Sequence, residues 1–593
     1  MKLIQPDFGS KNEAARTVGQ HYQALILMLG ITLLTFGGIG SRLAYLQLIE
    51  GTRNQQLAEN NRIRLIPKQP ERGNIFDRKG RILATSRLSH SVYVWPMAPK
   101  KPEWPATRKR LAQILNTPET EIQQRMDQAG FHSSTLIRIA RDINPSQITA
   151  FAEYKNQIKD VEVYIEAVRT YPNGQLAAHA LGYTGEMNDK QLAKKRKEGY
   201  RLGDVIGQMG VEAAFEKHLR GEWGGQQVEV DGKGQILRYL GEKEAKSGND
   251  LHLTLDLDLQ KAAEKALGDR QGAIVAIDPR NGGVLAMVSR PAFDPNIFSK
   301  RFTPALWRSL QKKDDPFVNR ALRGFPPAST YKIITTTAGL ESGKFSPKTV
   351  LQTYGCMNIG GTNFCDWNLA GFGPLGFVGA LAWSSDTFFY QIGRGVGGPT
   401  LIDWTRRYGF GKKTGIELAP EEARGLVADD AWKRENYELP WKVGDTVNMS
   451  IGQGFLQVTP LQVAVMFAVP ASSGYRVMPH LLKDSKETKR RQKLNLKPTT
   501  VQILRQGLRQ VVSGGTGRAL DSPTIPPSSG KSGTAETYKK KSHTWFGGYG
   551  PSDKPEIVVV AFAEHSGGGG GKICAPMVLQ VMEAYFKSRG AKR

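Results

Sequence analysis

The chain has 593 residues, of which 39% are hydrophobic and 23% charged, so it is long enough for two or three domains with buried cores. This composition excludes a disordered, a collagen-like or a polytopic membrane protein. Lysine and arginine number 81 against 55 acidic residues, and the formal net charge of +26 favours an anionic partner such as nucleic acid, phospholipid headgroups or an acidic polymer.

The N-terminus contains one long apolar stretch. Residues 22–41 carry no charge, and at about 1.5 Å per residue they can cross a hydrocarbon core of about 30 Å. A secretory signal would have a shorter apolar core and a small-residue cleavage site, whereas Arg42 and an amphipathic stretch follow here. We therefore predict a single transmembrane anchor at 22–42, rather than a buried core helix, after a cytoplasmic N-terminus at 1–21.

The orientation of this anchor rests on a weaker argument. Basic residues flank the stretch on both sides, so the positive-inside rule does not determine its orientation. A long C-terminal part after a single anchor usually crosses the membrane. We therefore expect a single-pass protein of the cytoplasmic membrane with the remaining chain on its periplasmic side, where nucleic acid is not a partner.

The hydrophobic pattern of the sequence after the anchor changes near residue 251. Residues 43–250 mix short β-rich runs, at 90–95 and 161–168, with charged helical stretches. The alternating LHLTLDLDL at 251–259 predicts a half-buried strand, and the following residues predict a helix. Asn-Gly within 272–290 predicts a hairpin between two strands.

The C-terminal end adds further strands and a helix. HTWFGGY at 543–549 and the apolar run at 556–565 predict another strand pair, and a helical pattern follows them. Strands at both ends of a long helical middle predict an α/β sheet flanked by a helical subdomain.

Ser329 and Lys332 form the first candidate for chemistry. A serine three residues before a lysine on a helix places both side chains on one face, and a desolvated lysine can take the hydroxyl proton. Ser309–Lys312 and Ser528–Lys531 match the same pattern, but only Ser329 follows two prolines, after which a helix is expected to begin.

Two further groups strengthen this candidate. Ser384-Ser385-Asp386 interrupts two helical segments, although a simple helix boundary with a serine cap explains it equally well. Lys531-Ser532-Gly533-Thr534 leads into a predicted edge strand, where a lysine and hydroxyls can hold a carboxylate and Gly533 lets a substrate backbone approach. The three groups, in this order, resemble the S-x-x-K, S-D-N and K-T-G elements of penicillin-binding proteins and β-lactamases. Asp386 stands where many relatives have asparagine, and Ser532 stands where threonine is commoner.

With these motifs the chain resembles a class B penicillin-binding protein over nearly its whole length. The stretches at 72–84, 169–185 and 207–221 resemble the family's signatures in its non-catalytic pedestal domain, and 450–464 resembles a transpeptidase signature. The serine-containing SSDTFFY and the 420–433 region are similar to the elongation-type penicillin-binding protein 2.

The resemblance implies a multidomain α+β and α/β protein. It comprises the anchor, an elongated β-rich pedestal or dimerisation-like domain at 43–250, and a transpeptidase domain at 251–593 with an antiparallel sheet flanked by helices. The implied activity is a D,D-transpeptidase that cross-links D-Ala-D-Ala stem peptides of peptidoglycan and is acylated by β-lactams. The implied partners are a RodA-type glycosyltransferase and the elongation complex.

The resemblance also implies a role for each site residue. Ser329 is the expected nucleophile, Lys332 the general base, and Ser384 and Lys531 the proton relay to the leaving amine. The expected substrate-binding residues are Asp386, Ser532, Gly533 and Thr534, with an oxyanion hole from the N–H groups of Ser329 and Thr534. Ala328 replaces the glycine usual before the nucleophile, but no catalytic group is missing.

No cofactor is expected, and the cysteines carry a separate prediction. Cys356 and Cys365 lie nine apart, and outside the cytoplasm we expect a disulfide between them. Some relatives resemble metal binders in this region, but no histidine occurs from 356 to 386, so we expect no metal. Cys574 is expected to be a packed thiol, and the glycine run 567–571 a turn near the active-site rim.

Three alternatives to an elongation-type transpeptidase remain open from the sequence. A division-type relative is the nearest. A β-lactam-hydrolysing or β-lactam-sensing protein can share the same serine, lysine and carboxylate-binding strand. A catalytically idle scaffold is the third, although the complete set of catalytic residues argues against it.

Overall fold

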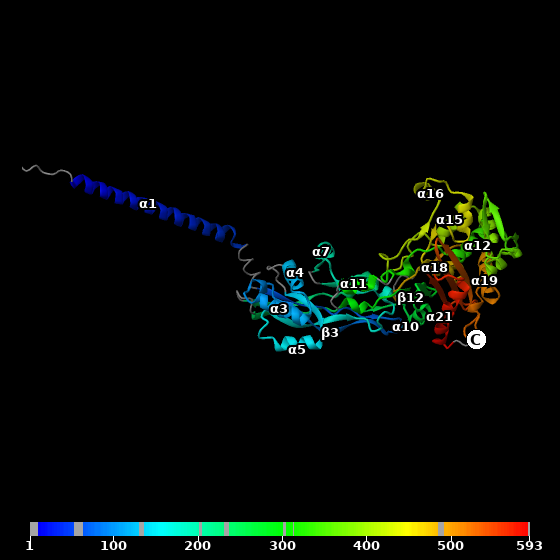
Figure 1. Cartoon of the computed structure of the whole chain (residues 1–593), viewed down its shortest axis with the longest axis horizontal. Helices are drawn as coiled ribbons and strands as arrows, with labels where there is room; N and C mark the ends of the chain where they lie inside the picture. The colour runs from blue at the N-terminus through cyan, green and yellow to red at the C-terminus, as the bar shows by residue number, and fades with distance from the viewer. Residues whose placement is uncertain are drawn as a thin grey trace, which may run out of the picture.

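The computed structural model describes residues 10–52, 63–129, 136–200, 204–230, 236–299, 304–311, 314–483 and 491–590. The molecule is elongated, with a long N-terminal helix, a β-rich N-terminal body and a C-terminal body in succession (Figure 1). Residues 1–9 of the predicted cytoplasmic segment, and 484–490 of a basic stretch near residue 490, lie outside the described residues.

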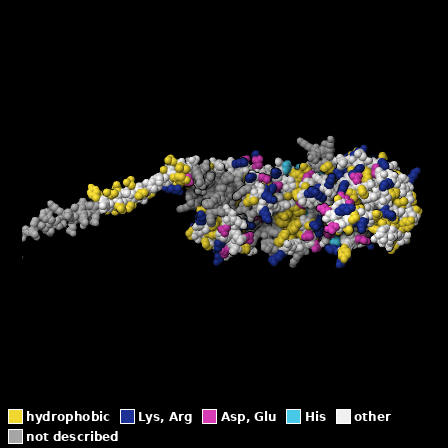
Figure 2. Space-filling view, turned by 90° about the horizontal axis from the view of Figure 1, so that it is seen from above, with side chains coloured by type: hydrophobic (Ala, Val, Ile, Leu, Met, Phe, Trp, Pro, Cys, Tyr) yellow, Lys and Arg dark blue, Asp and Glu magenta, His cyan; other side chains and the backbone are white. Residues whose placement is uncertain are grey.

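The apolar stretch forms a helix that stands away from the body. Helix α1 (Ser10–Ala44) continues into the π-helical turn η1 (Tyr45–Ile49). Tyr22–Ile49 is long and apolar enough to cross a membrane, and its apolar side chains are exposed (Figure 2). Nothing in the described chain covers these side chains, as expected for a helix whose solvent is lipid. The helix therefore fits the predicted anchor, and it extends beyond residue 42.

The N-terminal body is built on a five-stranded sheet of order β10-β2-β3-β4, with β5 pairing β3. The predicted strands at 90–95 and 161–168 are confirmed, because they lie in β3 and β5, which pair antiparallel from Thr85↔Thr170 to Val94↔Val161. The strands of this sheet are β2 (Ile75–Phe76), β3 (Ile82–Val94), β4 (Ile137–Ile143), β5 (Val161–Thr170) and β10 (Leu251–His252).

Three helices cover this sheet and share one core with it. The core includes Val92 and Val94 of β3, and Leu111 and Ile122 of the helices. The covering helices are α3 (Trp104–Leu115), α4 (Glu119–Ala129) and α5 (Pro145–Glu153). The remaining elements of this body are β1 (Ile63–Lys68), β6 (Thr184–Glu186), β7 (Val205–Gly207), β8 (Gly224–Val230), β9 (Ile236–Lys243), η2 (Ala98–Lys100), α6 (Ala178–Leu181), α7 (Asp189–Lys195), η3 (Arg196–Glu198), α8 (Gly210–Ala214) and α9 (Glu216–Leu219).

The three pedestal-like sequence stretches meet in one buried ion-pair cluster. Glu212 is fully buried and accepts hydrogen bonds from Arg72 Nε and Arg169 Nε, both at 2.6 Å. Arg72 also pairs with Glu216 at 2.8 Å, and Arg169 donates to the Gly73 carbonyl at 2.8 Å. The cluster explains why charged residues recur in these stretches, since a buried charge needs a hydrogen-bonded partner of opposite sign.

The predicted strand at 251–259 is wrong beyond its first two residues. Only Leu251 and His252 form a strand, which pairs parallel with β2, and helix α10 (Leu257–Leu267) begins inside the alternating run. The Asp256 side chain accepts from the N–H groups of Asp258 and Leu259, so it caps the helix. Alternating Leu and Asp therefore marked a helix cap rather than a pleated strand.

The C-terminal body is built on an antiparallel sheet of order β12-β11-β23-β22-β21. Its strands are β11 (Gly272–Ile277), β12 (Val284–Arg290), β21 (Ser529–Thr537), β22 (Lys540–Gly550) and β23 (Ile557–Ala563). The predicted strand pairs are confirmed. The predicted tight Asn-Gly turn is wrong, since residues 278–283 separate the two strands of the first hairpin. Gly282 lies against Met478 there, and a Cβ would lie 2.2 Å from the Met478 carbonyl oxygen.

Helices cover both faces of this sheet. Alternate residues of β23 point to opposite faces and contact different helices. Val559 and Ala561 pack with α10 and α21 (Ala575–Lys587), whereas Val558 and Val560 pack with α18 (Pro460–Ala471). This alternation follows from the two-residue period of a strand. The predicted C-terminal helix is confirmed as α21.

The segment between β12 and β21 supplies the predicted helical subdomain. Its helices are η4 (Pro295–Ser299), α11 (Pro304–Gln311), η5 (Arg320–Leu322), η6 (Ala328–Tyr331), α12 (Lys332–Glu341), α13 (Phe377–Trp383), α14 (Asp386–Val396), α15 (Gly398–Arg407), α16 (Asp430–Tyr437), α17 (Val443–Ser450), α19 (Pro498–Ser513) and η7 (Arg518–Leu520). Its short strands are β13 (Val350–Thr353), β14 (Cys356–Ile359), β15 (Thr362–Cys365), β16 (Gly373–Gly376), β17 (Leu426–Val427), β18 (Leu456–Gln457), β19 (Tyr475–Val477) and β20 (Arg491–Lys493). Helix α20 (Gly570–Ile573) precedes α21.

Candidate active site

Ser329 lies on a 3-10 turn, η6, that runs into helix α12. Two hydrogen bonds fix the residues before the turn. Trp545 Nε1 donates to the Pro326 carbonyl at 2.9 Å, and Thr330 Oγ1 donates to the Pro327 carbonyl at 2.7 Å. Ser329 is partly exposed, while Lys332, the first residue of α12, is fully buried. The predicted helix start after the prolines is therefore confirmed, with a 3-10 turn before the α-helix.

Gly452 supports the turn from the other side. The Ala328 N–H donates to the Gly452 carbonyl at 3.0 Å, and a Cβ on Gly452 would lie 2.3 Å from the Ala328 carbonyl oxygen. Gly452 has φ +76°, and Ala328 itself has φ +50°. Ala328 thus occupies a left-handed conformation that glycine adopts more readily, which explains why glycine is usual at this position.

Ser384, Ser385 and Asp386 form a corner between two helices. Ser384 ends α13 with φ +56°, and Asp386 begins α14. Between them the Ser385 side chain caps α14 by accepting from Phe388 N at 3.4 Å. The helix-boundary interpretation of these serines is therefore correct, and the sharp turn also aims Ser384 and Asp386 at the two buried lysines. The corner combines a structural and a chemical role.

Lys332 is held by this corner. Its Nζ donates to the Ser384 carbonyl at 2.7 Å, to Asp386 Oδ1 at 2.7 Å and to Ser384 Oγ at 3.3 Å. Burial raises the pKa of the Asp386 carboxyl; the Lys332 ammonium opposes this rise and the nearby Asp366 carboxylate adds to it. No hydrogen bond links Ser329 Oγ with Lys332 Nζ in the described part of the chain.

Lys531 reaches the same serine from the edge strand β21. Its Nζ donates to Ser384 Oγ at 2.8 Å and to the Ser532 carbonyl at 3.0 Å. Burial, together with the positive charge of Lys332, holds the pKa of Lys531 well below its usual value, although Asp386 works against this. The Ser384 hydroxyl therefore bridges two buried lysines, one of which burial makes easy to deprotonate.

The rest of the edge strand borders the nucleophile's turn. A Cβ on Gly533 would lie 3.2 Å from the Pro327 carbonyl oxygen, so the turn carrying Ser329 lies against β21 at this glycine. Ser532 Oγ is hydrogen-bonded to Thr516 Oγ1 at 2.8 Å, and Thr534 is exposed. The Gly570 N–H points to Thr534 Oγ1 at 3.4 Å, so the glycine run of 567–571 lies beside this strand.

The other two serine–lysine spacings do not form comparable pairs. Ser309 is exposed on α11, and Lys312 lies outside the described residues. Ser528 donates its hydroxyl to the Pro526 carbonyl at 2.8 Å, while Lys531 is directed at Ser384. The structure thus brings Lys332, Ser384, Asp386 and Lys531 together, with Ser329 one helical turn from Lys332.

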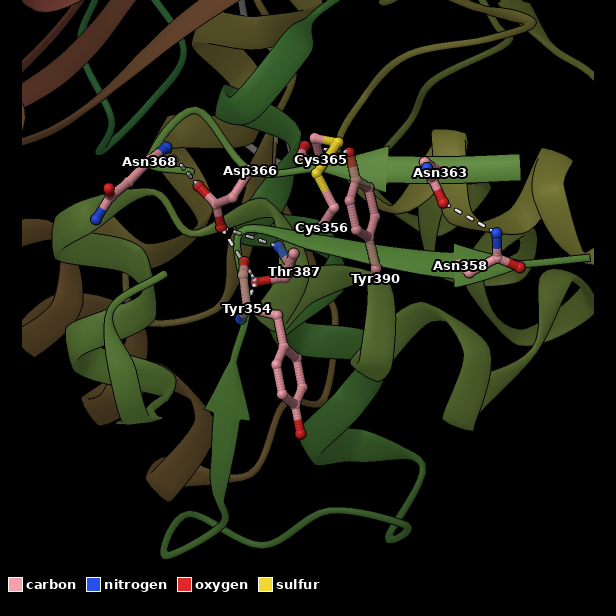
Figure 3. Close-up of a disulfide and its surroundings, with 9 residues drawn as sticks. All are labelled: Tyr354, Cys356, Asn358, Asn363, Cys365, Asp366, Asn368, Thr387 and Tyr390. Carbon is pink, nitrogen blue, oxygen red and sulfur yellow. Dashed lines mark hydrogen bonds between the residues drawn. A yellow bond between two sulfur atoms is a disulfide. The ribbon is translucent and has the colours of Figure 1, made fainter. Parts of the chain in front are cut away.

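The predicted disulfide between Cys356 and Cys365 is confirmed, and it joins the directly paired residues of hairpin β14–β15 (Figure 3). Among the described residues no group of three or more histidine, cysteine, aspartate or glutamate side chains could hold a metal ion. Cys574 is buried, as predicted, and burial raises the pKa of its thiol to about 12.

Comparison with known proteins agrees with this geometry. Residues 272–583 match the penicillin-binding protein transpeptidase domain, and residues 67–253 match the penicillin-binding protein dimerisation domain. The chain belongs to the penicillin-binding protein family. The matched transpeptidase domain contains the four clustered side chains and the strand that carries Lys531; the four are Lys332, Ser384, Asp386 and Lys531.

Similar proteins identify the branch of the penicillin-binding family. The peptidoglycan D,D-transpeptidase MrdA of Acinetobacter baumannii is 34% identical over 576 residues, which cover 92% of this chain and 85% of that protein. The structure of penicillin-binding protein 2 with MreC from Helicobacter pylori aligns with a TM-score of 0.76 at 27% identity, covering 89% of this chain and 99% of that one. A chain from a structure on the coordination of polymerization and crosslinking by a peptidoglycan synthase complex aligns at 33% identity and a TM-score of 0.69, covering 96% of this chain and 98% of that one.

Two residues that contact the candidate site, Gly452 and Asp366, were not predicted from the sequence. Gly452 is one of several residues in the 450–464 stretch. Its close approach to Ala328, which is distant in the chain, has no sequence motif that would predict it. Asp366 lies in the region where some relatives resemble metal binders, and no other role was predicted for it. Its buried carboxylate instead accepts hydrogen bonds from Ser385 and Thr387.

Proposed function

We propose that this protein is a serine-type peptidoglycan D,D-transpeptidase of the elongation type. The observation that carries the proposal is the Ser384 hydroxyl, which lies between the ammonium groups of Lys332 and Lys531 at 3.3 and 2.8 Å. Ser329 lies one helical turn from Lys332, so a serine that can carry a proton from Lys332 to Lys531 prepares the base that the nucleophile Ser329 requires. The names of the similar proteins support peptidoglycan as the substrate.

The first half-reaction is acylation. Ser329 Oγ attacks the carbonyl carbon of the penultimate D-Ala of a donor stem peptide, and its proton passes to Lys332. The N–H groups of Ser329 and Thr534 hold the resulting oxyanion, whose charge develops only in the transition state. The C–N bond then breaks, and the leaving amine of the terminal D-Ala takes a proton from the relay.

The relay joins three side chains. Lys332 donates to Ser384, and Lys531 donates to the same oxygen. Because burial depresses the pKa of Lys531, its amine can be neutral. Once its lone pair turns toward Ser384 Oγ, the neutral amine accepts the Ser384 hydroxyl proton while Ser384 takes one from Lys332. That transfer leaves Lys332 neutral and able to act as the general base. Asp386, hydrogen-bonded to Lys332 Nζ, orients it.

The second half-reaction forms the crosslink. An amine of a neighbouring stem peptide attacks the ester on Ser329, a new amide bond forms, and the serine regains its proton. Ser532 and Thr534 bind the terminal carboxylate of the donor, and Gly533 leaves room for its backbone. β-Lactams acylate the same serine.

We further propose that the body after the anchor works on the periplasmic side of the cytoplasmic membrane. The domain boundaries are those expected from the sequence, with the pedestal at 43–250 and the transpeptidase domain at 251–593. Its partners are a RodA-type glycosyltransferase and other elongation proteins. The solved structures of similar proteins with MreC and in a peptidoglycan synthase complex support this assembly.

Intact-protein mass spectrometry tests the activity. The full chain in detergent is treated with benzylpenicillin, alongside Ser329→Ala. We expect a stable adduct of one penicillin on the wild type and none on the variant. A transient adduct with rapid drug hydrolysis would favour a β-lactamase, and no adduct on folded wild type would favour an idle scaffold.

A further inference from the structure

The corner that carries Ser384 and Asp386 is held from outside by one buried carboxylate. Asp366 is 3% exposed, and its Oδ2 accepts from Ser385 Oγ at 2.8 Å, from Thr387 N at 3.1 Å and from Thr387 Oγ1 at 3.2 Å. Ser385 and Thr387 flank Asp386 in the sequence, so the Asp366 carboxylate is hydrogen-bonded to the residues on both sides of Asp386.

This carboxylate has no cationic partner in the described part of the chain. Hydrogen bonds from Ser385 Oγ and Thr387 N, both in the corner, therefore offset much of its desolvation. The Thr387 hydroxyl shares its one proton between Asp366 Oδ2 and a second acceptor, and Asn368 N reaches Asp366 Oδ1 at 3.5 Å. Without Asp366, the hydroxyl of Ser385 and the N–H of Thr387 lose their acceptor in a buried setting. Without these hydrogen bonds, the backbone of residues 384–386 would no longer hold Ser384 in contact with Lys332 and Lys531.

Asp366 is in turn fixed by the disulfide that precedes it. Cys365 is bonded to Cys356, and the Asp366 N–H donates to the Gly355 carbonyl at 2.8 Å on the far side of the same bridge. Figure 3 shows the Asp366 side chain directed from the base of the hairpin toward Thr387 and Tyr354. Thr387 Oγ1 lies 3.0 Å from the Tyr354 carbonyl oxygen and 3.2 Å from Asp366 Oδ2, so its one proton is shared between acceptors on the two sides of the bridge.

The hairpin has little else to hold it closed. Both cysteines are exposed, and of its eight residues only Ile359 is buried, in a small cluster with Tyr390 and Val447. The Tyr390 hydroxyl donates to the Cys365 carbonyl at 3.4 Å. The position of Asp366 thus depends on a solvent-accessible covalent bond as well as on this small cluster and its own hydrogen bonds.

We propose that Asp366 is a positioning residue for acyl transfer, and that the Cys356–Cys365 disulfide holds it in place. This inference rests on the proposed function. It means that the enzyme reaches full activity only after its hairpin is oxidised, and that a thiol reductant slows it without unfolding it.

The test measures acylation of the full chain in detergent by a fluorescent penicillin, with the affinity and the acylation rate constant resolved separately. Asp366→Ala is expected to lower the rate constant by about tenfold to a hundredfold and leave the affinity nearly unchanged, because misplaced reacting groups act on the chemical step. Asp366→Asn keeps one acceptor oxygen and is expected to recover most of the rate.

The Asn variant also gives a readout that a purely structural role would not move. Asp386 faces Lys332, Lys531, Tyr390 and Asp366, and the Asp366 charge contributes to its raised pKa. Removing that charge is expected to shift the acid limb of the acylation profile to lower pH. An unshifted limb together with an unchanged rate in both Asp366 variants would overturn the proposal.

The disulfide arm uses Cys356→Ser combined with Cys365→Ser. This pair is expected to slow acylation, and adding Asp366→Ala to it is expected to cost less than the product of the separate losses, since both act through one corner. A reductant is expected to slow the wild type but not the serine pair. Fully multiplicative losses, or a reductant-insensitive wild type, would overturn the link between the bridge and Asp366.

A matched control lies in the same hairpin. Asn363 accepts a hydrogen bond from Asn358 at 2.9 Å, away from the bridge, and Asn363→Ala is expected to acylate like the wild type. If Asn363→Ala is as slow as Asp366→Ala, general damage to the hairpin explains the loss and the proposal fails. If the wild type itself is not acylated, the proposed function fails first.

Discussion

At the residue scale, the site depends on backbone conformations that side chains disfavour. Ala328 and Ser384 both have positive φ values, and each stands next to a group that acts in the proposed reaction. Such residues cost about 1–2 kcal/mol each, and they persist only where surrounding contacts determine the backbone. At Ala328 those contacts come from Gly452, and at Ser384 they come from both lysines.

Gly452→Ala tests the support under the nucleophile. The added Cβ would meet the Ala328 carbonyl oxygen at 2.3 Å, so the turn carrying Ser329 must shift. We expect a loss of stability of about 1–2 kcal/mol or more and acylation slowed at least about tenfold, measured by unfolding and by fluorescent-penicillin labelling.

Gly343 offers a matched control for this change. It has φ +74°, close to the +76° of Gly452, but no atom lies within 4 Å of a Cβ placed there. Gly343→Ala is expected to lose similar stability and to keep its acylation rate. Equal rates in the two variants would mean that Gly452 supports the fold alone.

The pKa of Asp386 predicts a pH dependence. Because burial raises it, the carboxyl takes up a proton at a higher pH than an ordinary aspartate as the solution is acidified. Protonation removes the acceptor of Lys332 Nζ, so the acylation rate is expected to fall with an acid midpoint above about 4. Asp386→Asn is expected to be slow and flat over this range. An acid limb at or below the ordinary aspartate value would contradict the assignment.

At the element scale, one contact between the N-terminal and C-terminal bodies completes the cap of a helix. Asp77, in the turn between β2 and β3, accepts from Leu257 N at 3.1 Å at the start of α10 and from Arg81 Nη2 at 2.7 Å. Arg81 also reaches Asp256, which caps α10. The pedestal-like stretch at 72–84 thus completes the cap of a helix in the C-terminal body.

Asp77→Ala is expected to destabilise the protein by about 2–3 kcal/mol, because it leaves buried N–H groups without their charged acceptor. Asp258 is a matched control, since it binds the same Arg81 at 2.7 Å but its side chain is about half exposed. Asp258→Ala is expected to cost less than about 1 kcal/mol. Denaturant unfolding of the full chain measures both, and equal losses would contradict the capping role.

The same carboxylate predicts acid sensitivity of the fold. Burial alone would raise the pKa of Asp77, but hydrogen bonds from Arg81, Leu257 and Lys79 hold it below its usual value. Its folded-state pKa is therefore lower than in the unfolded chain, so its contribution is present above about pH 4 and is lost as pH falls through the folded value. Asp77→Asn is expected to flatten the stability profile in that acid range. A profile as steep as that of the wild type would exclude Asp77 as a cause.

Much of the fold could be predicted from the sequence, and the exceptions have a common cause. The hairpins of the C-terminal sheet and helix α21 are local patterns with a clear period, and they were predicted correctly. Residues 251–259 and the roles of Gly452 and Asp366 were not, because each depends on a partner distant in the chain. Each makes a hydrogen bond across the chain: the Leu257 N–H donates to Asp77, the Gly452 carbonyl accepts from the Ala328 N–H, and Asp366 accepts from Ser385 Oγ. Of the site, the sequence motifs identified the chemical groups but not the residues that hold them.

At the scale of the whole molecule, the net charge of +26 is not explained by the active site. Lysine and arginine side chains are spread over the body on the face seen in Figure 2, mixed with fewer acidic ones. A single anchor at one end leaves that body free to meet extended anionic surfaces. Wall polymer and phospholipid headgroups are both anionic, and the proposed periplasmic placement would bring the body near both.

We expect the full chain in detergent to bind purified wall sacculi through this charge. Electrostatic attraction between exposed charges is screened over about 10 Å at 0.1 M salt and about 3 Å at 1 M. The bound fraction is therefore expected to fall steeply across this range, as measured by co-sedimentation, while Ser329→Ala binds like the wild type because no acyl bond is needed. Vesicles with anionic lipids, run beside neutral ones, separate headgroup binding from wall binding. Association with sacculi that does not change with salt would mean that specific contacts, rather than the overall charge, hold the enzyme to its polymer.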